Sequence, residues 1–110
     1  MTGSARRTRA GLSLPRLYPI TDRRIAGGLG HPAIVERLAA GGARLVQVRE
    51  KELEDRILVE QVRRCLRIPG ITLVVNDRTD VALACGAAGV HLGDEDLPVE
   101  AARALLGPAA

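Results

Sequence analysis

Two aspartates follow two apolar runs of the sequence, at positions that could bring their carboxylates together. Asp77 comes soon after the run 71–75, and Asp96 comes soon after the run 88–92. If the runs are neighbouring parallel strands, about 4.8 Å apart, both carboxylates lie at one edge of the sheet and repel each other unless a cation separates them. Mg²⁺, which proteins hold with one or two carboxylates plus water and phosphate oxygens, is the cation that such a pair favours.

Basic and amide side chains follow another apolar run. A strand through residues 45–49 would carry Gln47, Arg49 and, if it continues, Lys51 on one face, with two valines on the other. A buried arginine without a partner is costly, so Arg49 should meet an anion or a carboxylate. The anion could be a phosphate group. The carboxylates that could form a salt bridge instead are Asp22, Asp77 and Glu50.

Helix capping is the competing interpretation of the acidic motifs. Either Asn76 or Asp77 could cap the helical pattern that follows them. Residues 93–96 could form a glycine turn and an acidic first turn before a helix that begins near Pro98. Taken together, the two aspartates, the asparagine and the two basic residues favour a magnesium site for a departing diphosphate.

The elements that would position these residues alternate between strand and helix. Apolar runs with the length of buried strands lie at 17–20, 45–49, 71–75 and 88–92. Helical patterns follow them at 32–40, 54–67, 79–85 and 98–106. This order predicts an α/β fold of parallel (β/α) repeats with right-handed crossovers, in which ligands bind at the carboxyl ends of the strands.

The composition excludes several classes of protein. The chain has 110 residues, 46% of them hydrophobic, which suits one small domain with an aliphatic core. No apolar run reaches the roughly 18 residues that a membrane-spanning helix needs. Tyr18 is the only aromatic residue, which argues against modules that stack nucleic-acid bases on aromatic side chains. We therefore expect neither a membrane nor a nucleic-acid partner.

Much of the net charge of +3 comes from arginines near the start of the chain, at positions 6, 7, 9 and 16. We expect residues 1–15 to form a disordered basic tail and residues 16–110 to form the domain. No apolar segment that would make a secretory signal follows the arginines. Cys65 and Cys85 lack metal-type spacing and are interpreted as reduced thiols, so we expect a cytoplasmic protein.

Neither histidine is interpreted as a catalytic group. His31 precedes Pro32 and is typical of the start of a helix. His91 lies inside the fourth apolar run, where packing or a backbone hydrogen bond is the simpler role.

Four motifs, in this order and spacing, resemble the strand ends of the thiamine phosphate synthase family. They are LYPITD at 17–22, VQVREK at 46–51, VNDR at 75–78 and GVHLGDEDL at 89–97. The resemblance implies a (β/α)₈ barrel that joins hydroxymethylpyrimidine diphosphate to thiazole phosphate and releases pyrophosphate. It also implies a dissociative reaction, in which pyrophosphate leaves before the thiazole nitrogen attacks.

The resemblance also assigns roles to individual residues. Gln47 would lie near the pyrimidine, with Arg49, Lys51 and Asn76 on the diphosphate. Asp77 and Asp96 would hold Mg²⁺. The related thiazole tautomerases tend to lack these metal motifs, which makes them the less favoured alternative. Asp94 departs from the glutamine that the synthases usually carry at this position.

An eight-unit barrel needs roughly 200 to 250 residues, and this chain supplies four units of a TIM-type barrel, a half barrel. The strands at 17–20 and 89–92 would then have unpaired edges, which a second copy of the chain or a complementary half could close. Three hypotheses follow: an enzyme half that is active once the barrel is closed, a non-catalytic module for Mg²⁺-diphosphate or for a partner, and an inactive truncated relic.

Overall fold

A computed structural model describes residues 6–7 and 13–110 of the chain. The strands are β1 (Arg6–Arg7), β2 (Ser13–Leu14), β3 (Leu45–Val48), β4 (Thr72–Asn76) and β5 (Gly89–His91). The helices are α1 (His31–Ala40), α2 (Asp55–Leu66), α3 (Thr79–Cys85) and α4 (Val99–Leu106). The four predicted helices are therefore present, each within one residue of its expected bounds.

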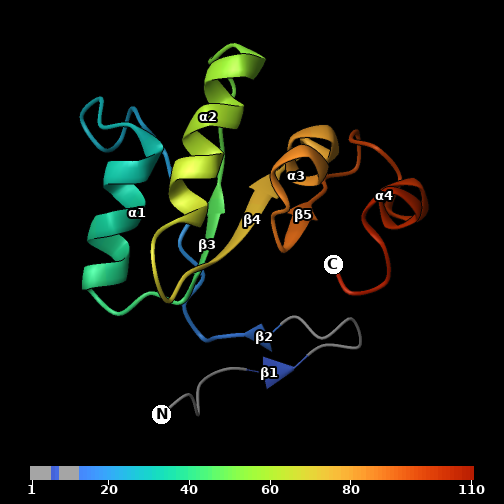
Figure 1. Cartoon of the computed structure of the whole chain (residues 1–110), viewed down its shortest axis with the longest axis horizontal. Helices are drawn as coiled ribbons and strands as arrows, with labels where there is room; N and C mark the ends of the chain where they lie inside the picture. The colour runs from blue at the N-terminus through green and yellow to red at the C-terminus, as the bar shows by residue number, and fades with distance from the viewer. Residues whose placement is uncertain (1–5, 8–12) are drawn as a thin grey trace.

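The sheet that carries the candidate residues is parallel, in the order β3-β4-β5. Val46 pairs with Leu73, and Val75 pairs with Val90. A helix follows each of these strands, and Figure 1 shows the helices succeeding one another along the sheet. The predicted α/β fold with parallel strands is confirmed.

The first predicted strand, at 17–20, is not a strand in the structure. Only Ile20 forms a parallel bridge, to Gln47 of β3. The Gln47 N–H donates to the Pro19 carbonyl at 2.9 Å, and the Thr21 N–H donates to the Gln47 carbonyl at 2.9 Å. Pro19 has no N–H to extend the ladder, and Leu17 is 78% exposed, so little burial holds this segment extended. The described residues thus hold three parallel strands and one bridge, not four strands.

The predicted tail at 1–15 falls largely outside the described residues, which exclude 1–5 and 8–12. The two short described pieces, β1 and β2, pair antiparallel, with Arg6 opposite Leu14 and Arg7 opposite Ser13. The division into a tail and a domain stays a prediction.

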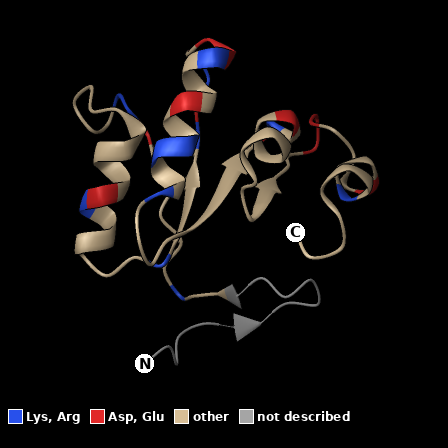
Figure 2. Ribbon diagram, in the orientation of Figure 1, with Lys and Arg blue, Asp and Glu red and all other residues tan. Residues whose placement is uncertain are grey.

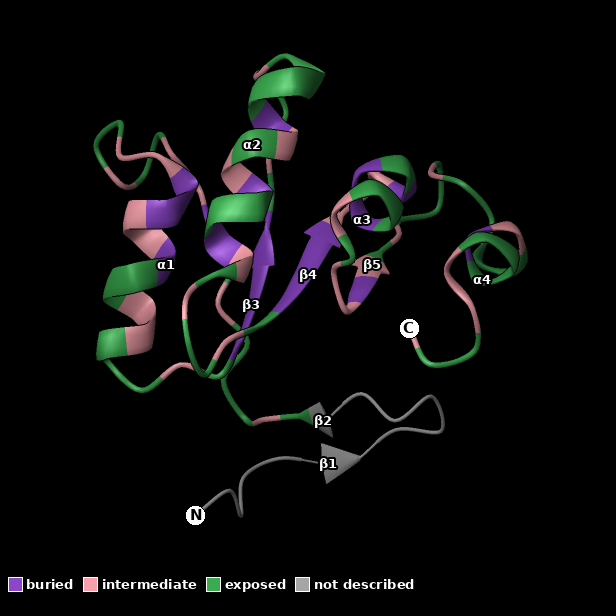
Figure 3. Ribbon diagram, viewed as in Figure 1, coloured by how far each residue is buried: buried purple, intermediate pink, exposed green. Residues whose placement is uncertain are grey.

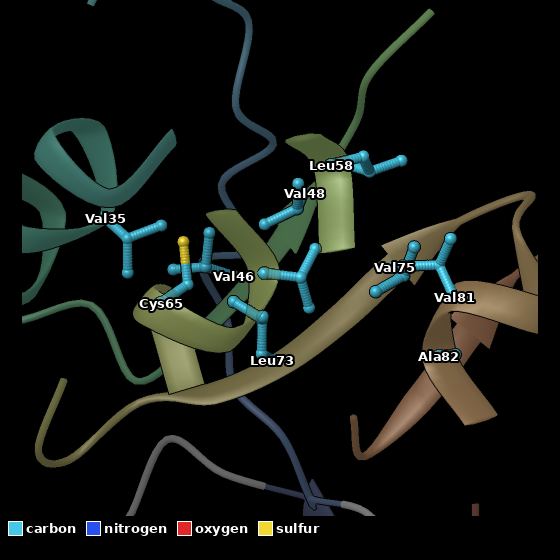
Figure 4. Packing of buried hydrophobic residues seen from close by; sticks show 10 residues of the cluster. Val35, Val46, Val48, Leu58, Cys65, Leu73, Val75, Val81 and Ala82 are labelled. Carbon is cyan, nitrogen blue, oxygen red and sulfur yellow. The ribbon is translucent and has the colours of Figure 1, made fainter. Parts of the chain in front are cut away.

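An aliphatic core lies between the sheet and helices α1, α2 and α3. Figure 3 shows β3 and the middle of β4 buried, while the helices alternate between buried and exposed residues. The side chains that meet in this core are Val46 and Val48 of β3, Leu73 and Val75 of β4, Val35 of α1, Leu58, Val62 and Cys65 of α2, and Val81 and Ala82 of α3 (Figure 4). Each large side chain buried in this way contributes about 1.5–3 kcal/mol.

Because successive strand residues face opposite ways, the valines that build this core leave Gln47 and Asn76 on the other face of the sheet. The core therefore orients the polar residues of the candidate site.

The remaining expectations concern the thiols and the membrane. Cys65 and Cys85 are free, and burial raises the pKa of the Cys65 thiol to about 12, so this thiol is a packing residue. None of the helices within residues 13–110 has the length and apolar character to span a bilayer.

Candidate active site

A pair of amide side chains crosses from β3 to β4. Gln47 is buried, and its Oε1 accepts a hydrogen bond from Asn76 Nδ2 at 2.8 Å. Its own Nε2 donates to the Tyr18 hydroxyl at 3.1 Å. Asn76 Oδ1 is also buried, but no partner for it lies within the described part of the chain. The pair thus leaves one unsatisfied acceptor near the end of β4, a costly arrangement that a ligand could relieve.

Asp77 occupies a backbone conformation that non-glycine residues rarely adopt. Its φ is +64°, in the left-handed region that aspartate tolerates better than most residues. Its N–H donates to the His91 carbonyl at 2.7 Å, which ties the end of β4 to β5. This bond also gives His91 the backbone role expected for it.

Neither Asn76 nor Asp77 caps helix α3. The N-cap residue is Arg78, and no side chain bonds to the helix end. The capping alternative is therefore wrong for these two residues, since the left-handed turn at Asp77 intervenes between the strand and the helix.

Asp96 closes a tight turn after β5. Its Oδ2 accepts the Gly93 N–H at 2.7 Å, and its N–H donates to the Gly93 carbonyl at 3.2 Å. Helix α4 has Pro98 as its N-cap, without a side-chain bond, so Asp96 does not cap this helix either. Figure 2 shows the acidic turn between β5 and α4.

The carboxylates of Asp77 and Asp96 are close enough to interact with each other, as the neighbouring strands predict. Burial and the neighbouring Asp96 raise the pKa of Asp77 above its ordinary value. The Gly93 N–H, by contrast, lowers the pKa of Asp96. Two like charges therefore meet at this edge of the sheet, and a cation between them would relieve the repulsion.

Lys51 reaches the same edge from the end of β3. Its Nζ lies 3.8 Å from Asp77 Oδ2, with both side chains partly exposed, which makes this a weak ion pair. Lys51 also lines a cleft of about 200 Å³, whose other lining side chains are basic (Arg23, Arg24 and Arg49) and acidic (Asp22, Glu50 and Glu52).

Arg49 is exposed, and no carboxylate among residues 13–110 forms an ion pair with it. The alternative of a salt bridge to Asp22, Asp77 or Glu50 is therefore wrong within the part of the chain that the structure describes. The strand ends at Val48, so Arg49 lies beyond the buried sheet and its charge faces the cleft. Its exposure removes the argument that burial must supply it with an anion.

Sequence reasoning missed a network around Glu50. Its carboxylate accepts from Arg23 at 2.6 and 2.7 Å and bonds to His31 Nε2 at 2.6 Å. His31 is the first residue of α1, as expected, but it is fully buried and its Nδ1 bonds to the Thr21 hydroxyl at 2.8 Å. One sequence signal was present: alternation along the chain turns Glu50 away from Arg49 and Lys51, towards the interior, where a carboxylate needs a cation.

The donors at the edge of the sheet fit Mg²⁺. Asp77 and Asp96 supply carboxylates from two adjoining turns, and the orphaned Asn76 Oδ1 is a further oxygen nearby along the chain. Across residues 13–110, no group of three or more His, Cys, Asp or Glu side chains gathers into a cage. A pair of carboxylates suits Mg²⁺, which keeps several waters and takes further oxygens from phosphates.

Several known proteins resemble this chain over most of its length. A family model described as thiamine monophosphate synthase matches residues 17–110. Thiamine-phosphate synthase of Azorhizobium caulinodans is 52% identical over 95 residues, covering 84% of this chain and 45% of that protein. Thiamine-phosphate synthase of Albidiferax ferrireducens is 50% identical over 96 residues, with 84% and 44% covered.

A solved structure, thiamine phosphate pyrophosphorylase from Pyrococcus furiosus, superposes with a TM-score of 0.70 at 39% identity. The match covers 79% of this chain and 43% of that one. The chain thus spans less than half the length of these relatives. With a family match over most of its residues and relatives at about half identity, the chain belongs to the thiamine monophosphate synthase family.

Proposed function

We propose that this chain supplies the diphosphate- and magnesium-binding part of a thiamine-phosphate synthase site. The reaction would transfer the hydroxymethylpyrimidine group from its diphosphate to thiazole phosphate, with release of pyrophosphate. The observation that carries the proposal is the meeting of Asp77, Asp96 and Lys51 at the carboxyl end of adjoining parallel strands. This is the edge where α/β folds bind their ligands.

Asp77 and Asp96 would hold Mg²⁺, and the ion would neutralise negative charge as it grows on the departing diphosphate. Lys51, now in a weak pair with Asp77, has protons free for phosphate oxygens. Arg49 faces the neighbouring cleft and can offer its planar fork of N–H donors to the same group.

Asn76 and Gln47 would act on opposite sides of the departing bond. The hydrogen bond between Asn76 Nδ2 and Gln47 Oε1 orients the two side chains relative to each other. Asn76 would then bind the diphosphate, and Gln47 would lie near the pyrimidine. The Tyr18 hydroxyl holds the far end of Gln47 in place. A preorganised polar pair of this kind lowers the cost of orienting the substrate.

We further propose that the chain forms four units of a barrel. The segment at Ile20 would be the first strand, reduced to one bridge, followed by β3, β4 and β5. A second copy of the chain or a complementary half would close the barrel and supply the remaining contacts to thiazole phosphate. A cytoplasmic location, with no nucleic-acid partner, remains the expectation from the composition.

Binding is the first test. Calorimetry of the chain with pyrophosphate should give heat in the presence of Mg²⁺ and little without it. The Asp77→Asn variant should weaken this binding by at least about tenfold, since it removes one charge of the pair. Asp80→Asn is the matched control. It makes the same substitution three residues away, at a carboxylate that pairs with Arg78 and has no role in the proposed site.

Turnover is the second test. The chain is mixed with the part of the Azorhizobium caulinodans relative that it does not cover, and pyrophosphate release is followed with both substrates and Mg²⁺. We expect release that depends on both components and is lost with Asp77→Asn. The proposed function would be overturned if the chain showed no Mg²⁺-dependent binding of pyrophosphate.

A non-catalytic role is the second candidate, because the carboxylate pair and Lys51 are groups that can bind Mg²⁺ and phosphate without turnover. In that case the chain would bind Mg²⁺ and pyrophosphate but never release pyrophosphate from the substrates. The pattern of binding without turnover, in the same two assays, separates this candidate from the enzyme. A tautomerase-like activity would instead proceed without Mg²⁺.

A further inference from the structure

We propose that Glu50 is a positioning residue: its buried carboxylate fixes the turn that presents Arg49 and Lys51 to a phosphate-bearing ligand. The ligand class rests on the proposed function, but the positioning can be tested without it. Glu50 lines the same cleft, but Arg23, His31 and two backbone N–H groups occupy its carboxylate, so Glu50 contacts no ligand in this scheme.

Glu50 is the most completely bonded charged side chain near the site. Its side chain is 4% exposed, and it accepts both arms of Arg23. Its Oε2 also accepts the backbone N–H groups of Glu52 and Leu53, at 2.9 and 3.0 Å. The carboxylate therefore binds the chain on both sides of Lys51, and the turn from 50 to 53 closes around it.

A second anchor holds the residue before Glu50. The Arg49 N–H donates to the Thr21 hydroxyl oxygen at 3.1 Å. Because the Glu50 carboxylate can only accept, His31 Nε2 carries the proton of the neutral ring, and His31 Nδ1 then accepts a hydrogen bond from the Thr21 hydroxyl. Arg49, Thr21, His31 and Glu50 thus form a closed ring of hydrogen bonds and chain.

The ring connects three parts of the fold that are far apart in sequence. Thr21 follows the bridge beside β3, His31 begins α1, and Arg49 directly follows β3. Residues 50–53 lie beyond the sheet, so no strand ladder holds them. The positions of Arg49 and Lys51 in the cleft consequently depend on the side-chain bonds of Glu50 and Thr21.

A pair of matched variants separates positioning from charge. Glu50→Gln and Glu52→Gln each remove one negative charge, two residues apart. Electrostatics alone would tighten the binding of an anion in both variants. Positioning predicts the opposite for Glu50→Gln, a loss of about tenfold in affinity for pyrophosphate with Mg²⁺, while Glu52→Gln binds as well as the wild type or better.

Thr21 gives a milder version of the same test. Thr21→Val keeps the shape but removes the acceptor for the Arg49 N–H, and we expect a loss of about threefold. Thr21→Ser keeps the hydroxyl and should bind like the wild type. Circular dichroism would reveal whether Glu50→Gln folds. If it does not, the two Thr21 variants test the positioning in its place.

A readout without ligand keeps this inference separate from the proposed function. Amide hydrogen exchange by NMR should show the Glu52 and Leu53 amides at least tenfold less protected in Glu50→Gln, with Val75 in β4 unchanged. If the wild type bound no pyrophosphate, the proposed function would fail and the exchange data would still test the positioning. Unchanged exchange at both amides, or tighter pyrophosphate binding by Glu50→Gln, would overturn it.

Discussion

The acidic side chains near Lys51 form two groups, Glu50 alone and Asp77 with Asp96, and the fold surrounds these groups differently. Glu50 is buried, and its charge is met by Arg23, by His31 and by two backbone N–H groups. Asp77 and Asp96 lie at the surface, close to each other, with a weak contact to Lys51 as compensation. The first group is satisfied by the chain itself, while the second is left with repulsion that the chain does not remove.

The contrast separates a residue that supports the fold from residues that bind Mg²⁺ under the proposed function. A carboxylate with a full set of donors gains nothing from a further cation, and removing it leaves its buried partners unpaired. A crowded pair of exposed carboxylates costs stability in the free chain and gains from a bound cation. Charge alone therefore does not identify a site, since both groups are acidic and adjacent.

The largest expected effect tests the supporting role of the first group. Glu50→Ala should lower the free energy of unfolding by about 3 kcal/mol, because it leaves Arg23 and His31 without their shared partner. Urea denaturation followed by circular dichroism measures this loss. Glu52→Ala, where the side chain is 55% exposed and pairs only with the more exposed Arg24, should stay within about 0.5 kcal/mol of the wild type. Equal losses in the two variants would remove the distinction.

Binding of Mg²⁺-pyrophosphate should stabilise the chain through the second group and not through the first. A hundredfold excess of Mg²⁺-pyrophosphate over its Kd should stabilise the chain by about 2.7 kcal/mol and raise the Tm accordingly. Asp96→Asn should lose most of the rise in Tm. Asp94→Asn removes one negative charge from the same turn, two residues away, and should keep the rise in Tm. A rise in Tm that survives Asp96→Asn would show that the ligand binds elsewhere.

The sequence was sufficient to predict the parallel sheet and the meeting of the two aspartates. The runs before Asp77 and Asp96 are apolar and successive, so their strands had to be neighbours and their ends had to share an edge. The left-handed turn at Asp77 was not predicted, because aspartate also suits a helix cap, and capping was the interpretation weighed instead.

The Glu50 network could not be predicted in the same way. Its side-chain bonds to Arg23 and His31 join Glu50 to residues 27 and 19 positions away, so no local pattern contains these partners. The first strand failed for a local reason, since Pro19 interrupts the ladder in a run that otherwise has strand composition. Apolar composition marks burial, and here the segment is largely exposed.

Acidification should weaken the first group. Arg23 holds the pKa of Glu50 well below its ordinary value of 4.5, and burial lowers the pKa of His31 below 6.5. Glu50 and His31 both bind protons more readily when the chain is unfolded. Their contribution to the free energy of unfolding is therefore present at neutral pH and is lost as the pH falls. The loss begins below about pH 6.5 through His31 and grows below about pH 4.5 through Glu50.

Asp77, in the second group, changes the stability with pH in the opposite direction. Its raised pKa makes protonation easier in the folded chain, so through this residue the free energy of unfolding rises as the pH falls. Tm values measured at pH 7, 5.5 and 4 should fall steadily in the wild type. In Glu50→Gln the step between pH 5.5 and 4 should be smaller, because residue 50 no longer takes up a proton in the unfolded chain over this range. An equal step in both proteins would contradict the link between the acid sensitivity and Glu50.

The smallest effect concerns the backbone at Asp77, where the needs of the site and of the fold meet. At a φ of +64°, asparagine is tolerated about as well as aspartate, while alanine is not. Asp77→Ala should therefore be about 1 kcal/mol less stable than Asp77→Asn in urea denaturation, although both lack the carboxylate. If the left-handed turn serves to aim the carboxylate at Asp96, Asp77→Asn should be at least as stable as the wild type, because the repulsion disappears while the turn remains. A clear loss of stability in Asp77→Asn would instead assign Asp77 to the supporting group and move the boundary between the two regions.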